Sequence, residues 1–213
     1  MKTTTQILLT MFFCWLISTG LASAQKMVAL DIGSYDGYGT VKQKSGEILN
    51  DTLYFSFAAD GKLRLAKKNP NDPLEMPRKY TPSDVEYFTI ADTTFVPVKT
   101  PSTLAGAGEF MIQLTPEGYK IQLFKKYEQS EDKTRILHKF YAMFPNQKNA
   151  RDIVNDLSLI PFSKKVPKLI TDCPDLTEKI GKKEDLYKIP MISNEKTCYS
   201  VYRQVADNYQ TCN

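Results

Sequence analysis

Apolar and polar residues alternate in short runs along the first two thirds of the chain. In residues 47–57 the apolar side chains share one parity, the period of two expected of a half-buried strand: Leu49, Leu53, Phe55 and Phe57. Asp60-Gly61 predicts a hairpin turn from this run into residues 62–66. Further short runs of this kind are 38–42, 85–91, 94–98, 110–114 and 119–124. Short strands joined by turn residues predict an antiparallel barrel or sandwich rather than a parallel α/β fold.

Residues 134–160 fit two patterns. Helical spacing is shown by Ile136, Leu137, Phe140, Tyr141 and Phe144, with Pro145 as a stop signal. The same segment also fits a strand over 140–144 that pairs, through a turn at 146–149, with residues 153–160. The residues alone leave both interpretations open.

From Ser163 onward the pattern is helical. A short helix is expected over 163–171, and Asp172 is expected to cap a second one that ends at Gly181. A last helix, capped by Ser193 or Asn194, is predicted to run to about Tyr209.

The apolar stripe of this last helix consists of Cys198, Val201, Tyr202, Val205 and Tyr209. We expect the stripe to dock on the β part. The prediction is therefore an α+β fold: an antiparallel β-rich body over 25–160, followed by a helical C-terminal region over 161–213 that packs on it.

The first 24 residues have the pattern of a secretory signal peptide. Lys2 precedes an apolar run over 7–17, and Ala22-Ser23-Ala24 forms an A-x-A cleavage signature. The run is too short to span a bilayer, which takes roughly 20 apolar residues. We therefore expect an exported protein, periplasmic or extracellular, whose mature chain begins at Gln25 and has no transmembrane segment.

Charge and motifs exclude several classes of function. The formal net charge of +4 falls by one when Lys2 leaves with the leader, and no basic stripe predicts nucleic-acid binding. His138 is the only histidine, so neither a histidine-rich metal site nor any cofactor is expected. Gly106-Ala107-Gly108 is interpreted as a flexible loop. The carboxylate pairs Glu131-Asp132 and Glu184-Asp185 are expected to be solvated.

Removal of the leader takes Cys14 away and leaves Cys173, Cys198 and Cys212. On one helix, Cys198 and Cys212 would lie about 21 Å apart, whereas a disulfide needs Cα atoms within about 7 Å. Cys173 must therefore take part in any bridge. We favour Cys173–Cys212 over Cys173–Cys198, and the absence of a bridge is the third possibility.

Several segments, taken together, resemble uncharacterised exported proteins of Bacteroidota. They are 37–41, 46–49, 80–85 with Phe88, 117–123, and the helix Asp172-Cys173-Pro174-Asp175-Leu176-Thr177-Glu178-Lys179-Ile180, which is similar to a "D-C-P-E-L-x-x-K-I" motif. The resemblance implies a β-rich body with a helical C-terminus, and so favours strands over 140–160. It implies no established activity. Thr52 and Thr93 lie in D-T-x triplets of the kind glycosylated in such proteins, and Asn50-Asp51-Thr52 is also an N-glycosylation sequon.

Export, a β body and the missing catalytic motifs together predict a non-enzymatic protein that binds a partner protein, a glycan or another envelope component. One alternative is a hydrolase of glycans or peptidoglycan that uses an Asp/Glu pair. Another is a lipocalin-like carrier of small ligands. Two facing carboxylates in a cleft would favour the hydrolase, and an apolar barrel mouth would favour the carrier.

Overall fold

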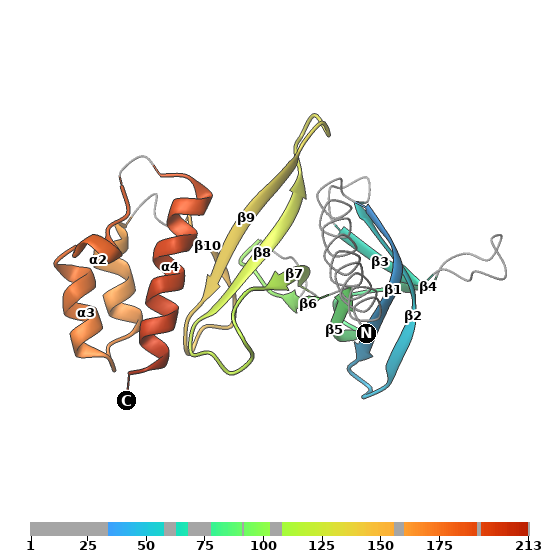
Figure 1. Cartoon of the computed structure of the whole chain (residues 1–213), viewed down its shortest axis with the longest axis horizontal. Helices are drawn as coiled ribbons and strands as arrows, with labels where there is room; N and C mark the ends of the chain where they lie inside the picture. Colours follow the sequence, from blue (N-terminus) through green and yellow to red (C-terminus); the bar gives the residue numbers. More distant parts are fainter. Residues whose placement is uncertain are drawn as a thin grey trace, which may run out of the picture.

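The computed structural model describes residues 34–57, 63–67, 78–90, 92–102, 108–155, 160–190 and 193–212. These residues form one antiparallel ten-stranded sheet, curled into a half-barrel, with helices stacked against one end (Figure 1). The strands are β1 (Ser34–Gln43), β2 (Ile48–Phe57), β3 (Leu63–Lys67), β4 (Arg78–Tyr80), β5 (Val85–Ile90), β6 (Thr93–Val98), β7 (Glu109–Gln113), β8 (Gln122–Gln129), β9 (Ile136–Met143) and β10 (Arg151–Asp152). The helices are α2 (Phe162–Lys165), the 3-10 turn η3 (Val166–Leu169), α3 (Pro174–Gly181), the 3-10 turn η4 (Asp185–Tyr187) and α4 (Glu195–Gln210). The predicted α+β class is confirmed.

The curl of the sheet follows from the pairing of β5. This strand pairs with β1 and not with β4, the strand that precedes it along the chain. The strand order is β10-β9-β8-β7-β6-β5-β1-β2-β3-β4, which places β4 and β5 four strands apart. In a flat sheet that separation would be about 19 Å. Residues 81–84 connect the two strands in a turn closed by the Asp84 N–H, which donates to the Thr81 carbonyl at 3.0 Å. Because such a turn spans less than about 7 Å, the sheet must bend until the ends of β4 and β5 meet.

The inner face of the curl is filled by an aromatic core. Phe88 and Phe95 are cross-strand partners with stacked rings whose centroids lie 4.6 Å apart. Phe55 and Phe110 meet this pair edge-on, at centroid distances of 4.9 to 5.4 Å. Aliphatic side chains of alternating strand positions complete the cluster: Val41, Leu53, Leu65, Val85, Ile90 and Ile112. The period of two in the sequence thus marks the buried face of the curl.

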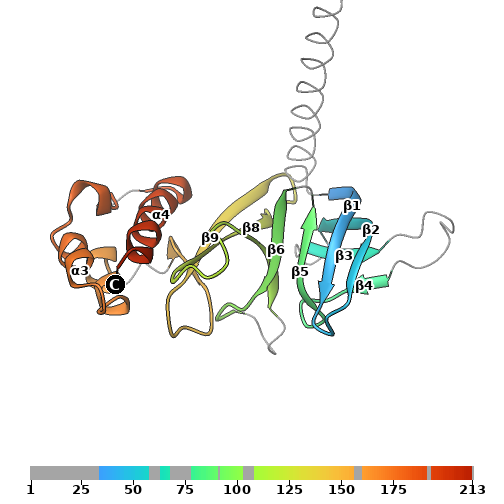
Figure 2. The same cartoon turned by 60° about the horizontal axis from the view of Figure 1, so that its bottom comes forward.

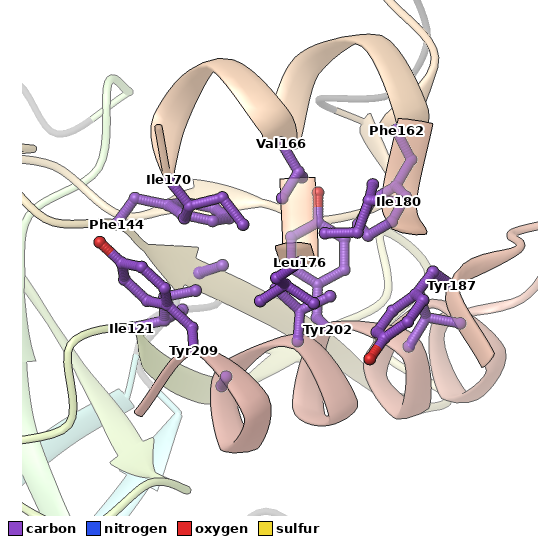
Figure 3. Close-up of a cluster of buried hydrophobic side chains, with 14 of the residues drawn as sticks. Ile121, Phe144, Phe162, Val166, Ile170, Leu176, Ile180, Tyr187, Tyr202 and Tyr209 are labelled. Atoms are coloured by element: carbon purple, nitrogen blue, oxygen red, sulfur yellow. The ribbon is translucent and has the colours of Figure 1, made fainter. Parts of the chain in front are cut away.

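A second core joins the other end of the sheet to the helices. Leu123 and Ala142, a cross-strand pair of β8 and β9, face the helical region. In Figure 3, Tyr202 of α4 lies among side chains of α2, η3 and α3, and Tyr209 lies beside Ile121, Phe144 and Ile170. The whole predicted stripe of α4 is buried: Cys198, Val201, Tyr202, Val205 and Tyr209. The helix lies between β9 and the other helices (Figures 1 and 2), and its Tyr199 ring stacks on Phe140 of β9 at a centroid distance of 4.6 Å.

Helix α4 begins as the sequence predicts. The side chain of Asn194 accepts a hydrogen bond from the Thr197 N–H at 2.9 Å, so Asn194 is the cap. The prediction that Asp172 caps α3 is wrong. The cap residue is Cys173, without a side-chain cap bond, and Asp172 instead accepts hydrogen bonds from the Tyr209 hydroxyl.

The segment with two interpretations is β structure at its start. β9 occupies Ile136–Met143 and pairs with β8 and β10, and β10 comprises Arg151–Asp152. Of the predicted partner strand, residues 153–155 lie outside β10, and residues 156–159 lie outside the described residues. The strand predicted from Tyr119 begins at Gln122 instead. The leader, Asp60-Gly61 and residues 103–107 lie outside the described residues. No helix in the described part of the chain is long and apolar enough to cross a membrane.

A substitution at Gly39 of β1 can test how tightly the side chains inside the curl are packed. A Cβ at this position would lie 2.5 Å from the Thr89 carbonyl oxygen and 2.6 Å from Leu53 Cδ1, whereas a Cβ at Gly181, at the end of α3, would meet nothing within 4 Å. We therefore expect Gly39→Ala to lower the free energy of unfolding by about 1–3 kcal/mol. Gly181→Ala should leave it unchanged or raise it by up to about 1 kcal/mol. Urea unfolding of both variants checks this, and equal midpoints would contradict it.

Candidate functional site

A groove of ≈ 800 Å³ lies on the outer face of the sheet, opposite the aromatic core. Its floor is formed by β1, β5, β6 and β7, and its wall by the start of the β7–β8 loop (residues 114–121). The groove is lined by Lys42, Glu86, Tyr87, Thr89, Thr94, Val96, Gln113, Leu114, Thr115, Pro116 and Glu117. Most of these side chains carry a hydroxyl, amide or charged group, so the groove suits a polar ligand.

The floor contains a row of polar side chains that crosses five adjacent strands. Thr40 of β1 is the cross-strand partner of both Asn50 and Thr89. Thr89 pairs in turn with Thr94, and the register of β6 with β7 continues the row to Gln113. The Thr40 hydroxyl donates to Asn50 Oδ1 at 2.7 Å. We name these five residues the polar row; Thr89, Thr94 and Gln113 lie within the groove itself.

Charged groups and a tyrosine lie beside the polar row. Lys42 Nζ donates to Glu86 Oε1 at 2.9 Å and lies 5.7 Å from the centroid of the Tyr87 ring. The hydrogen bond to Glu86 raises the pKa of Lys42, and Glu117 on the facing wall adds to this effect. Lys42 is thus paired with Glu86 on the floor of the groove, and Glu117 on the wall acts on it only through its charge.

The wall is built by the chain turning away from the sheet after β7. The Thr115 hydroxyl accepts a hydrogen bond from the Leu123 N–H at 3.0 Å, and the Leu114 N–H donates to the Leu123 carbonyl at 2.8 Å. Gly118 has φ +84°, a conformation that L side chains rarely adopt, so the turn depends on glycine there. Pro116 and Glu117 project to the surface.

A second hollow, of ≈ 440 Å³, lies beside the disulfide at the far end of the helical region. Cys173 and Cys212 are joined, with Cα atoms 5.8 Å apart, as the sequence favours. The Tyr209 hydroxyl donates to both oxygens of Asp172, at 2.6 and 2.8 Å. Asn208 Nδ2 donates to the Tyr187 hydroxyl at 2.6 Å. Asp172, Tyr187 and Asn208, which line the hollow, are thus engaged in hydrogen bonds within the helical region, which favours a structural role for them.

The remaining cysteine, Cys198, is fully buried in the core of the helical region. Its sulfur lies 3.3 Å from the Ser193 hydroxyl, and burial raises the pKa of the thiol. A buried thiol that resists ionisation is a poor nucleophile.

The two weak glycosylation candidates lie on strands. Thr52 is a half-buried residue within β2, and Thr93 begins β6, also half-buried. Asn50 of the sequon is exposed but belongs to the polar row, bonded to Thr40. The structure thus places the sequon inside a paired strand rather than on a turn.

The other candidates from the sequence do not form a site. His138 is exposed on β9, where its ring meets Tyr127 edge-on at 5.0 Å. Asp132 accepts hydrogen bonds from Ser130 and Thr134, which lower its pKa and shape the β8–β9 turn. Glu184 and Asp185 are exposed at the start of η4. Among the described residues no group of His, Cys, Asp or Glu could hold a metal ion.

A second charged cluster lies on the outer face of β7–β9. Lys126 contacts Glu109 and Glu128, and Lys139 also contacts Glu128. Burial acts to raise the pKa of Glu128, but its two lysine neighbours outweigh this and lower it. A carboxylate held ionised in this way is suited to bridging strands rather than to donating a proton.

Fold and site thus define a curled β sheet with a polar outer groove and a disulfide-linked helical end. Comparison with protein-family models, curated proteins and solved structures found no match. The resemblance to exported Bacteroidota proteins therefore stays a prediction.

Tyr209 provides a pH-dependent test of the helical end. Burial, together with the bond to Asp172, raises the pKa of Tyr209 from 10 to about 12. Because Asp172 is exposed, we expect Tyr209→Phe to lower the free energy of unfolding at pH 7 by only about 1 kcal/mol. A raised folded-state pKa contributes stability below pH 10, and that contribution is lost as pH rises through about 12. The difference between wild type and variant should therefore shrink over pH 10–12 in denaturant titrations. Tyr54→Phe, at an exposed position of β2, is the control, and a constant difference between wild type and Tyr209→Phe would contradict the assignment.

Proposed function

We propose that the protein is an exported, non-enzymatic module that binds a glycan chain in the outer groove. The observation that carries the proposal is the polar row, which places hydroxyl and amide groups side by side across five strands. Supporting export are the leader pattern of residues 1–24 and the disulfide, which suits an oxidising compartment.

Glycans match the groove in two respects. Sugar hydroxyls donate and accept hydrogen bonds, as do the hydroxyls of Thr89 and Thr94 and the amide of Gln113. Sugar rings also have apolar faces that pack on aromatic rings, and Tyr87 lies in the groove beside the polar row. Tyr38 and Tyr54 continue the same outer face on β1 and β2, where their side chains are 73% and 40% exposed. The face is thus long enough for several sugar units.

The hydrolase alternative has one specific observation in its favour, because Glu86 and Glu117 both line the groove. However, Lys42 Nζ already donates to Oε1 of Glu86. This contact competes with the hydrogen bond that a general acid must make to its substrate. The carrier alternative requires an open apolar cavity inside the curl that can hold a ligand. Four phenylalanine rings fill the described part of the curl, which argues against that function.

Titration calorimetry tests the proposal with two linear probes, the hexasaccharides of N-acetylglucosamine and of glucose. We expect at least one of them to bind the wild type, and the double variant Thr89→Val/Thr94→Val to weaken that binding about tenfold or more. Each substitution removes a hydroxyl at constant volume, and a hydrogen bond contributes about 0.5–1.5 kcal/mol. Thr171→Val, on the exposed surface of the helical region, is the matched control.

Two results would contradict glycan binding by a non-enzymatic protein. If neither hexasaccharide binds, the groove does not recognise linear glycans of this kind. If new reducing ends appear during incubation, and Glu117→Gln abolishes them, the protein is a hydrolase.

A further inference from the structure

The wall of the groove is anchored to α4 at both ends. At its start, Arg203 Nη1 donates to the Leu114 carbonyl at 3.0 Å. At its end, the Lys120 N–H donates to Gln210 Oε1 at 2.9 Å. Between these two points the loop is an exposed turn over Pro116 and Glu117, which line the groove. The loop thus depends on a helix that is distant in sequence and belongs to the other core.

Both anchors are themselves held in place. Arg203 Nε donates to both carboxylate oxygens of Asp207, each at 3.0 Å, and the guanidinium lies 5.9 Å from the centroid of the Tyr119 ring. Lys120 Nζ donates to the Cys212 carbonyl and lies 5.1 Å from the centroid of the Tyr209 ring. Charged donors make the stronger hydrogen bonds in proteins, so these contacts fix the loop more firmly than neutral ones would.

The disulfide fastens the end of α4 on which the second anchor depends. Cys212 follows the last turn of α4 and is bonded to Cys173 at the start of α3. Tyr209, which is buried as Figure 3 shows, ties the same turn to Asp172. Without the covalent bond, the terminal residues of a helix are free to fray, and the carbonyl that receives Lys120 would move with them.

We propose that α4 and its disulfide set the shape of the groove: Arg203 and Lys120 are positioning residues that hold its wall, and reduction of Cys173–Cys212 loosens that wall. The reductant is a dithiol. It gives up two electrons and two protons and becomes a cyclic disulfide, while Cys173 and Cys212 each become a thiol. The effect on ligand affinity rests on the glycan-binding proposal, whereas the effect on the loop does not.

Amide hydrogen exchange of the full chain tests the positioning directly. We expect the amides between Thr115 and Lys120 to exchange about tenfold faster after dithiol reduction and in Arg203→Met, because reduction loosens the support of the second anchor and the substitution removes the first. Arg203→Lys should stay close to wild type, since an ammonium group can still donate to the Leu114 carbonyl. Lys182→Met is the matched control, because it breaks an ion pair with Glu178 of the same i,i+4 spacing on α3, away from the loop.

An NMR measurement distinguishes a positioning role of Arg203 from a general effect of the substitution on stability. The NMR signals of the Tyr119 ring should shift in Arg203→Met and return in Arg203→Lys, while exchange at the amides of β5 and β6 stays unchanged. Unchanged loop exchange in both the reduced protein and Arg203→Met would overturn the proposal. Faster exchange throughout the sheet would also overturn it, because the loss would then be global.

The two proposals fail in different ways. In the reduced protein and in Arg203→Met, we expect the affinity for the hexasaccharide to fall about fivefold. A loosened loop with unchanged affinity would show that the wall does not set the groove. A wild type that binds neither hexasaccharide overturns glycan binding, and loop exchange alone then decides the positioning role.

Discussion

The turn between β4 and β5 is the constraint on which the rest of the molecule depends. Four residues bring together strands that lie four places apart in the sheet, so the sheet has to close on itself. The turn is reinforced by the Thr81 hydroxyl, which donates to Asp84 at 2.6 Å, and by the Lys44 N–H, which donates to the Asp84 carbonyl at 2.9 Å. Closure leaves an inner face that only apolar side chains can occupy. Polar side chains are consequently directed to the outer face, where they form the floor of the groove.

Strand β8 contributes side chains to both the aromatic core and the core of the helical region. Leu123 packs with the helices and Tyr127, four residues further on the same face, packs with the aromatic core. Leu114 lies at the junction and contacts both cores. The β7–β8 loop leaves the sheet at this junction, so one side of it faces α4 and the other faces the groove. Groove and helical region are therefore connected by the packing of the chain rather than by a separate interface.

Local features of this fold could be predicted from the sequence, whereas the groove could not. Alternation located the strands that carry Phe55 and Phe88, and the distance along one helix showed that Cys173 had to belong to any disulfide. The polar row escaped prediction because Thr40, Thr89 and Gln113 become neighbours only through cross-strand register. That register follows from the pairing of β1 with β5, a long-range contact with no local signal. Asp172 was misassigned for a similar reason, since its partner Tyr209 is distant in sequence and competes with the local capping bond.

The disulfide gives the helical region the rigidity that a support for the groove wall requires. It links residues 39 apart, and a loop of that length corresponds to about 4 kcal/mol of stabilisation in the chain-entropy estimate. Cys198 lies inside this loop and could exchange with the bond only as a thiolate. Burial raises the pKa of Cys198 and therefore disfavours that species, which favours retention of the Cys173–Cys212 pairing. With one pairing maintained, the end of α4 stays in register with Lys120. The exposed turn at Pro116 and Glu117 is then held by this support in addition to its own contacts, such as the hydrogen bond from the Tyr119 N–H to the Pro116 carbonyl at 3.3 Å.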